Sequence, residues 1–204
     1  MAEATAVPEV FQTQSEIFSI SLTVEGRKLW IPRDTLACHS LVFRQMLSDA
    51  GSWVEAQEAN VQLPDKKFED VVELLCVLVT CPTQKSVCKA NVDLLLGFAD
   101  EWEMKALLKH CHEFLVNHAF GLDTGDEDLL DLMVVASKYR LKSLLEAILP
   151  KCLNFNLLDI AGIEEKLLPE VRELIYKCRL CGCAGIDACS CAVKTTAAFL
   201  DHWC

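Results

Sequence analysis

Apolar and polar residues alternate near the start of the chain, between residues 18 and 25. Phe18, Ile20, Leu22 and Val24 occupy every second position, and serine, threonine and glutamate lie between and after them. An alternation with a period of two is typical of a β-strand with one buried face. Glu25-Gly26 then forms a tight turn before a short apolar segment at 28–31. The pattern therefore predicts a β-hairpin.

The apolar period changes from two to three or four after this hairpin. Pro32 presets a helix start, Leu36, Phe43 and Leu47 recur at near-helical spacing, and Ser40 is placed to cap a second short helix. The stretch 24–47 holds no catalytic nucleophile motif, phosphate loop or metal-ligand cluster. It indicates a packing and docking unit.

A third strand and a longer helix follow. Residues 61–63 are a short strand, and Pro64-Asp65 is predicted to be a turn that caps the next helix. From Phe68 onward, apolar residues recur at intervals of three and four, which indicates a helix with one buried face. These residues are Val71, Val72, Leu75, Leu78 and Val79. Cys81-Pro82 ends the helix.

The next part of the chain contains an internal repeat at an offset of 37 residues. The matching pairs are Leu95 with Leu132, Ala99 with Ala136, Trp102 with Tyr139, Met104 with Leu141, Lys105 with Lys142, Leu107 with Leu144, and Leu108 with Leu145. Each copy predicts two helices around a turn at the aromatic residue. The inner residues of the second copy are expected to be Leu132, Met133, Leu141, Leu144 and Leu145. Since such helix pairs bury their apolar stripe by stacking, we expect the second to pack on the first.

A further helix is predicted at Pro169 to Leu180, with Val171, Leu174 and Ile175 on its inner face. The periodic apolar stripes stop there. The composition then changes to cysteine, alanine and glycine.

The stretch 24–47 resembles the core of the BTB/POZ domain family. The residues in register with the family pattern are Gly26, Leu29, Arg33, Leu36, Ala37, Ser40, Phe43, Met46 and Leu47. The chain departs from the pattern at Ser19, where the family usually has aspartate, and at Pro32, where it usually has histidine. The connection between Val79 and Lys89 is longer than in the family. The resemblance implies an α+β fold, a small mostly antiparallel sheet flanked by helical hairpins.

The resemblance also implies a division of the chain. We expect a flexible amino terminus at 1–16, a BTB/POZ domain at 17–120 and a helical extension at 126–180. The extension, which follows an acidic linker at 123–128, resembles the three-box or BACK-like segment of nematode-type BTB proteins. Residues 181–204 are expected to be a disordered, cysteine-rich tail.

Composition excludes several functions. A net charge of −11 and a pI near 4.9 argue against binding nucleic acid, which needs a basic face. No segment has the roughly 18 uninterrupted apolar residues of a membrane span. The amino terminus lacks the basic and apolar regions of a secretory signal. The 12 cysteines are therefore expected to be reduced thiols in the cytosol, the nucleus or both.

By resemblance, the chain is a protein-interaction adaptor rather than an enzyme. It is expected to form homodimers or pair with other BTB proteins, and to recruit an unknown protein substrate to a cullin-3 ubiquitin ligase for ubiquitination. The resemblance places cullin binding at Trp53, Val54 and Glu55, together with Met46. It places the dimer interface at Arg33, Leu36 and Leu41. The chain shows no MATH or Kelch segment that would identify a substrate.

Two other functions remain open. The chain could be a BTB scaffold in transcription or channel regulation without a cullin, or a metal- or thiol-responsive regulator. The second rests on Cys178, Cys181, Cys183, Cys189 and Cys191, five thiols that could surround zinc or copper(I). Their spacing is shorter than in usual zinc sites, and acylation or an incidental tail are alternatives. No other cofactor is expected. In His110-Cys111-His112 the histidines diverge on a helix, and Cys111 falls at a core position.

Overall fold

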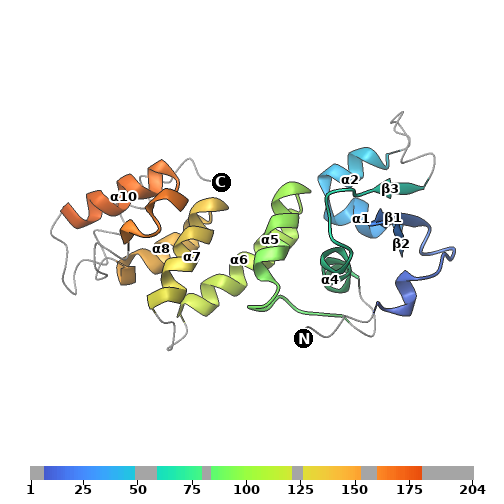
Figure 1. The fold of residues 1–204 in the computed structure, drawn as a ribbon, viewed down its shortest axis with the longest axis horizontal. Coiled ribbons are helices and arrows are strands. Elements are labelled where there is room, and N and C mark those ends of the chain that lie inside the picture. Colours follow the sequence, from blue (N-terminus) through green and yellow to red (C-terminus); the bar gives the residue numbers. More distant parts are fainter. Residues whose placement is uncertain (1–6, 49–58, 80–83, 121–125, 153–159, 181–204) are drawn as a thin grey trace. The chain divides into compact units, whose positions relative to one another are not determined.

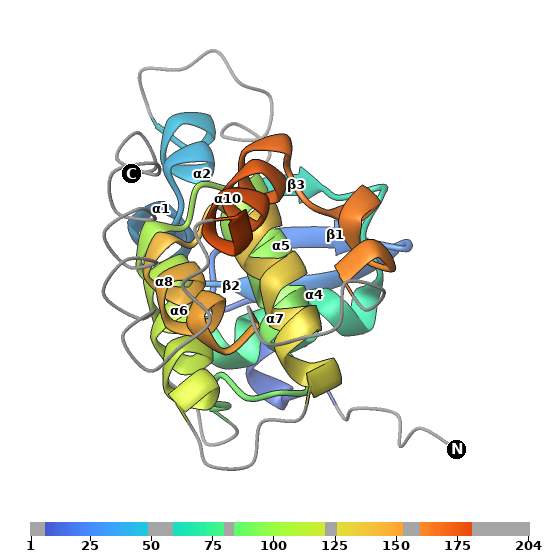
Figure 2. The ribbon, with the colours of Figure 1, turned by 90° about the vertical axis from the view of Figure 1, so that its left-hand side faces the viewer.

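The computed structural model describes residues 7–48, 59–79, 84–120, 126–152 and 160–180. It contains a three-stranded sheet in the order β2-β1-β3, formed by β1 (Ile20–Val24), β2 (Arg27–Ile31) and β3 (Asn60–Gln62). β1 and β2 are antiparallel and lie side by side, with Leu22 opposite Leu29 (Figure 2). β3 joins β1 in parallel, with Val61 opposite Leu22. The predicted hairpin, third strand and α+β class are confirmed.

The hairpin turn also contacts the amino terminus of a helix far along the chain. Glu25 and Gly26 both have positive φ, 50° and 75°, as in the two-residue turns whose twist matches the strands. Glu25 Oε2 accepts a hydrogen bond of 3.1 Å from the backbone N–H of Phe68, the first residue of α4 (Phe68–Leu78). The guanidinium of Arg27 lies 3.4 Å from the centroid of the Phe68 ring. The β1–β2 turn is therefore bound to the amino terminus of α4.

The predicted capping of α4 by the Pro64-Asp65 turn is wrong. The N-cap residue is Lys67, and its side chain makes no capping hydrogen bond within the residues that the structure describes. Glu25 satisfies one of the N–H groups left over at the helix start, from a turn distant in sequence. Its carboxylate also suits the positive end of the helix dipole.

The polar face of β1 differs from the simple alternation. Ser21 was expected on the solvent side, yet only 1% of its surface is exposed. Its hydroxyl donates to Asn60 Oδ1 at 2.9 Å, and the Thr23 hydroxyl donates to the same oxygen at 2.7 Å. Trp30 lies opposite Ser21 on β2. Ser21 is buried because neighbouring strands cover it and supply the hydrogen bond that burial requires.

The packed part of the chain begins earlier than the alternation indicates. Residues Glu9–Phe11 form a short 3-10 helix, η1, which packs near β2. Phe11 is fully buried, and its ring lies 6.3 Å from that of Phe18. An ordered segment thus precedes residue 17, within the stretch expected to be flexible.

The two repeats fold into helical hairpins with the same turn geometry. The first is α5 (Val92–Glu101) with α6 (Lys105–Phe120), and the second is α7 (Asp126–Lys138) with α8 (Lys142–Cys152). Glu103 and Arg140, which are 37 positions apart, both have positive φ, 50° and 53°. The next amide in each turn bonds a carbonyl five residues back: Met104 to Ala99 at 2.8 Å and Leu141 to Ala136 at 2.9 Å. The predicted repeat is confirmed down to its backbone hydrogen bonds.

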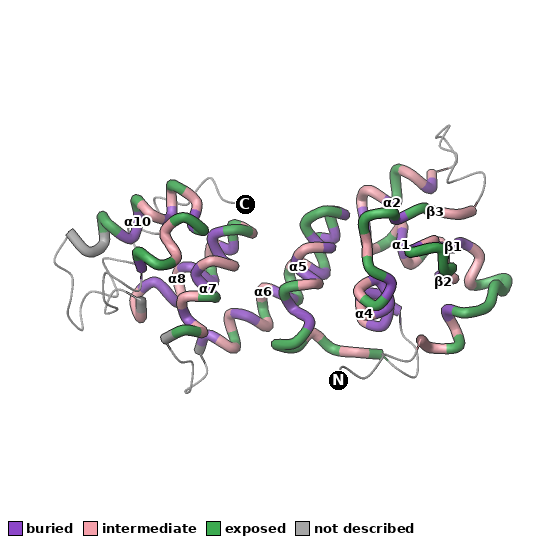
Figure 3. Tube along the Cα trace, viewed as in Figure 1, coloured by how far each residue is buried: buried purple, intermediate pink, exposed green. Residues whose placement is uncertain are grey.

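The second hairpin has the core that its sequence predicted. Its five predicted inner residues, Leu132, Met133, Leu141, Leu144 and Leu145, are all buried. α10 spans Pro169–Leu180, with Val171, Leu174 and Ile175 buried as expected, and follows a short 3-10 helix, η2 (Glu164–Lys166). Figure 3 shows buried and exposed positions alternating along α5, α7 and α10, the mark of helices with one inner face.

Hydrogen bonds between side chains and backbone groups link these helices. Buried Ser137 of α7 accepts a hydrogen bond of 2.8 Å from the N–H of Leu168, just before α10. Lys151 of α8 donates to the carbonyl of Ala119 near the end of α6. The last carbonyls of a helix have no partner within the helix, and a positive charge is favourable at that end. The Lys151 ammonium meets both conditions at the end of α6.

The chain divides into two compact units, Met1–Cys111 and His112–Cys204 (Figure 1). The predicted packing of the second hairpin on the first, and the predicted domain limits, stay predictions.

Candidate protein-interaction surface

Ser40 positions the pair of short helices α1 (Arg33–His39) and α2 (Leu41–Met46). It is fully buried and lies between the two helices. Its hydroxyl oxygen accepts a hydrogen bond of 3.1 Å from the N–H of Phe43, which confirms Ser40 as the predicted cap. The same hydroxyl donates to the carbonyl of Trp102 at 2.6 Å. One side chain thus fixes the start of α2 and links it to the end of α5.

Aromatic packing reinforces this link. The rings of Phe43 and Trp102 meet edge to face with centroids 5.0 Å apart, and Phe98 lies 4.6 Å from Trp102. All three residues are buried. Lys66 lies 5.6 Å from the Phe98 centroid and pairs with Glu101. Since edge-to-face pairs add to the benefit of burial, α2 has a firm base on α5.

The residues predicted to form the dimer interface lie in α1 and α2. Arg33 is half-buried and donates from its guanidinium to the carbonyl of Leu47, at the carboxyl end of α2. Leu36 is fully buried within the chain, so it cannot contact a partner directly. It can affect a partner only by positioning the residues packed around it. Leu41 is half-buried in the first turn of α2. Whether the chain dimerises through these residues stays a prediction.

Of the predicted cullin-binding residues, the structure describes only Met46. Met46, the last residue of α2, is half-buried. Trp53, Val54 and Glu55 lie outside the described residues, in the segment between α2 and β3. The assignment of these four residues to cullin binding stays a prediction.

Burial shifts the pKa of one thiol and two imidazoles in the part of the chain that the structure describes. Cys111 is fully buried in α6, as predicted, and burial raises the pKa of its thiol to about 12. Its thiolate, the reactive form, is therefore scarce at neutral pH. Burial lowers the pKa of His39, and the nearby His110 lowers it further. Burial likewise lowers the pKa of His112, against the effect of Glu113.

The predicted metal site falls almost entirely outside the described residues. Cys178 belongs to the last turns of α10, while Cys181, Cys183, Cys189 and Cys191 lie beyond residue 180. Within the described ranges, no group of three or more His, Cys, Asp or Glu side chains could hold a metal ion. The zinc or copper(I) hypothesis for the tail stays a prediction.

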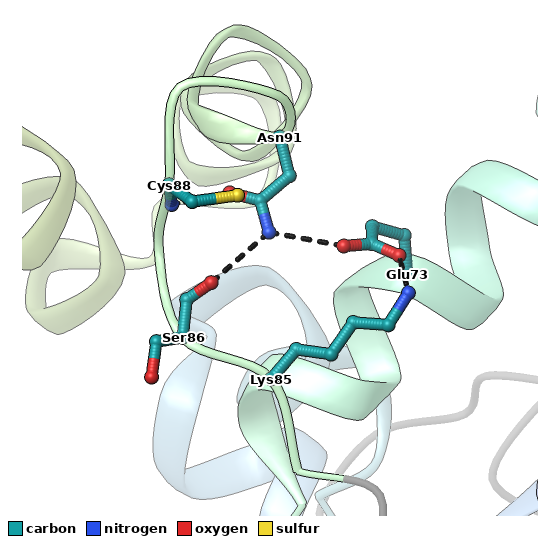
Figure 4. A network of polar contacts seen from close by, with 5 residues as sticks. All are labelled: Glu73, Lys85, Ser86, Cys88 and Asn91. Carbon is teal, nitrogen blue, oxygen red and sulfur yellow. Dashed lines mark hydrogen bonds and ion pairs between the residues drawn. The ribbon is translucent and has the colours of Figure 1, made fainter.

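A polar network that the sequence analysis did not predict connects α4 to the segment before α5 (Figure 4). Glu73 of α4 pairs with Lys85 and accepts a hydrogen bond of 3.0 Å from Asn91 Nδ2. Burial by itself raises the pKa of Glu73, but the hydrogen bonds from Lys85 and Asn91 and the charge of Lys85 outweigh it and lower the pKa. Asn91 is the N-cap residue of α5, a position that favours asparagine, but within the described residues its side chain binds Glu73, Ser86 and Cys88 and does not cap the helix. No sequence signal marks Glu73 as its partner.

Comparison with known proteins places the chain in a family. Residues 9–119 match the BTB/POZ domain, and the chain belongs to this family. It is 29% identical over 164 residues to BTB and MATH domain-containing protein 38 of Caenorhabditis elegans, covering 79% of this chain and 38% of that protein. It is 26% identical over 103 residues to BTB and MATH domain-containing protein 42 of the same organism, covering 50% and 25%. The chain thus spans two fifths or less of the length of these relatives.

Membership of this family indicates the general function of the chain. The BTB/POZ domain is a protein-interaction domain of a generally non-enzymatic, adaptor type, so protein partners are implied. Among the helices that the structure describes, none is long and apolar enough to cross a membrane. Because the family implies protein partners, the surface around α1 and α2 is a candidate protein interface.

Proposed function

We propose that this chain is an adaptor that recruits a protein substrate to a cullin-3 ubiquitin ligase. The observation that carries the proposal is the BTB/POZ domain at 9–119 together with the hydrophobic-x-Glu sequence Trp53-Val54-Glu55. In cullin-binding members of the family that the chain resembles, this motif lies in the loop before the third main strand. Here it ends five residues before Asn60, where β3 begins.

The chemistry of the motif suits a protein groove. A tryptophan in a polar loop offers a large rigid apolar surface, and aromatic residues of this kind commonly dominate binding energy. A neighbouring carboxylate accepts hydrogen bonds that fix the register of the contact. Contacts of Ser40 and Phe43 with Trp102 fix α2, the helix that precedes this loop in the sequence.

Substitution of Trp53 tests the proposal. Truncating a hot-spot aromatic commonly costs about 2 kcal/mol or more, so we expect Trp53→Ala to weaken cullin-3 binding by at least about twentyfold. Glu55→Ala should weaken it less, and Glu58→Ala, in the same loop, serves as the matched control. Binding is measured by calorimetry with purified cullin-3, and the thermal midpoint of each variant is measured beside it.

The outcomes separate the alternatives. Undiminished binding by Trp53→Ala, or loss of its fold, would show that this loop is not the cullin contact. Absence of cullin-3 binding by the unmodified chain would favour a BTB scaffold that works in transcription or channel regulation.

Self-association in the cytosol or nucleus belongs to the same proposal. Its support is the family membership and the half-buried side chains of Arg33 and Leu41 on α1 and α2. Light scattering on the full chain at tens of micromolar should give the mass of a dimer. A monomer at that concentration would contradict self-association. Ser19→Asp, which introduces the family's aspartate, would then be the first substitution to test.

A further inference from the structure

Residues 84–91, which we call the strap, are the part of the connection between α4 and α5 that immediately precedes α5. Its exposed residues are Gln84, Ser86, Cys88, Lys89 and Ala90. Val87 is its one large apolar residue and is half-buried. With so little apolar surface to bury, the hydrophobic effect gives the strap a weak hold on the core.

Polar contacts hold it instead, and the side chains of Lys85 and Asn91 both bind one carboxylate. Glu73 of α4 receives the Lys85 ammonium on one oxygen and the Asn91 amide, at 3.0 Å, on the other. The Glu73 side chain is 18% exposed and that of Lys85 is 37% exposed. Lys85 also donates its backbone N–H to the carbonyl of Cys76 at 2.9 Å.

The Asn91 side chain also binds two other residues of the strap. It is 4% exposed, donates to the carbonyl of Ser86 at 3.1 Å and accepts from the N–H of Cys88 at 2.8 Å (Figure 4). Its amide therefore connects both halves of the strap to Glu73. If the ammonium were neutralised, a largely buried carboxylate would lose its opposite charge, and an uncompensated buried charge is costly.

We propose that the strap is a charge-controlled latch, held against α4 by the Lys85 ammonium and released when that group is neutralised. Release would free residues 84–91 and the first turn of α5 while the sheet and α4 remain folded. The connection would then act as a conformational device independent of cullin binding.

Hydrogen exchange on the full chain tests the latch. Lys85→Gln should speed exchange of the amides of residues 85 and 88 by about tenfold, because their local opening becomes easier. Lys85→Arg, which keeps the charge, should stay within about twofold of the unmodified chain. Glu73→Gln should release the strap as Lys85→Gln does. Lys105→Gln, at an exposed position on α6, is the control for loss of a positive charge.

Two results would overturn the latch. Unchanged exchange at residues 85 and 88 in both Lys85→Gln and Glu73→Gln would show that the ion pair does not hold the strap. An equal increase in the amides of β1 and α4 would show that the substitutions destabilise the whole unit.

Discussion

At the scale of single residues, the two hairpin turns contain a conformation that their side chains do not favour. Glu103 and Arg140 have φ of 50° and 53°, in the left-handed region. Helices commonly end this way, but with glycine at the position. A side chain there costs about 1 kcal/mol or slightly more. Both turns are nevertheless kept in register by the buried residue that follows, Met104 or Leu141.

We therefore expect Glu103→Gly and Arg140→Gly to stabilise the fold, each by about 0.5–1 kcal/mol. Urea unfolding measures both. As a control, Asp100→Gly, within α5, should destabilise by a similar amount, and a loss of stability in both turn variants would contradict the assigned backbone conformation.

At the scale of elements, short helices depend on their ends. α1 has seven residues and α2 has six, too few to be stable helices by propensity. Ser40 compensates by capping α2 and by bonding the carbonyl at the end of α5. Arg33 adds a bond to the carbonyl of Leu47. The candidate interface is thus held by polar contacts at helix termini.

Ser40→Ala should lower the free energy of unfolding by about 1–3 kcal/mol, from loss of the cap and of the hydrogen bond to a buried carbonyl. Ser48→Ala is the matched control: its hydroxyl also bonds a carbonyl, Gln45, at 3.0 Å, but in an exposed setting. We expect that change to stay within about 0.5 kcal/mol. Chemical denaturation distinguishes the two, and equal effects would contradict a special role for Ser40.

At the scale of the whole molecule, the open question is how the two units share stability. Each unit has its own buried leucines, and α6, which is continuous from Lys105 to Phe120, contributes residues to both. The second hairpin was predicted to stack on the first. If it does, the chain should unfold as one cooperative unit, as small packed domains usually do.

Leu144→Ala tests this cooperativity. Leu144 is fully buried in α8, and truncating a buried leucine costs about 2–5 kcal/mol. We expect the single unfolding midpoint to fall, as observed by calorimetry. Ser143→Ala, at the adjacent exposed position on the same helix, is the control for a surface change and should leave the midpoint nearly unchanged. Two transitions with only the second displaced would contradict packing between the units.

Local periodicity was enough to predict most elements of this protein. The alternation at 18–24 predicted the hairpin, and intervals of three and four predicted α4 and α10, the second with the observed bounds. The offset of 37 residues predicted two equivalent turns. These inferences succeed because the side-chain directions of a strand or helix repeat with a fixed period, so neighbours in sequence reveal which face is buried.

The sequence determined less about the candidate interface. Family resemblance located Arg33, Leu36, Leu41 and Met46 on one unit, and Ser40 was correctly predicted as a cap. It did not reveal that Leu36 is fully buried, since helical spacing marks an apolar stripe without showing what covers it. Burial depends on neighbouring elements, which the local pattern does not specify.

Tertiary structure alone decided the contacts between distant segments. Glu25 caps α4 from 43 residues away, Asn60 pairs with Ser21 across 39, and Glu73 binds Asn91 across 18. Each bond requires that two elements already lie side by side in a particular register. Sequence spacing contains no record of that register, because a hydrogen bond depends on distances of about 3 Å in space and not on separation along the chain.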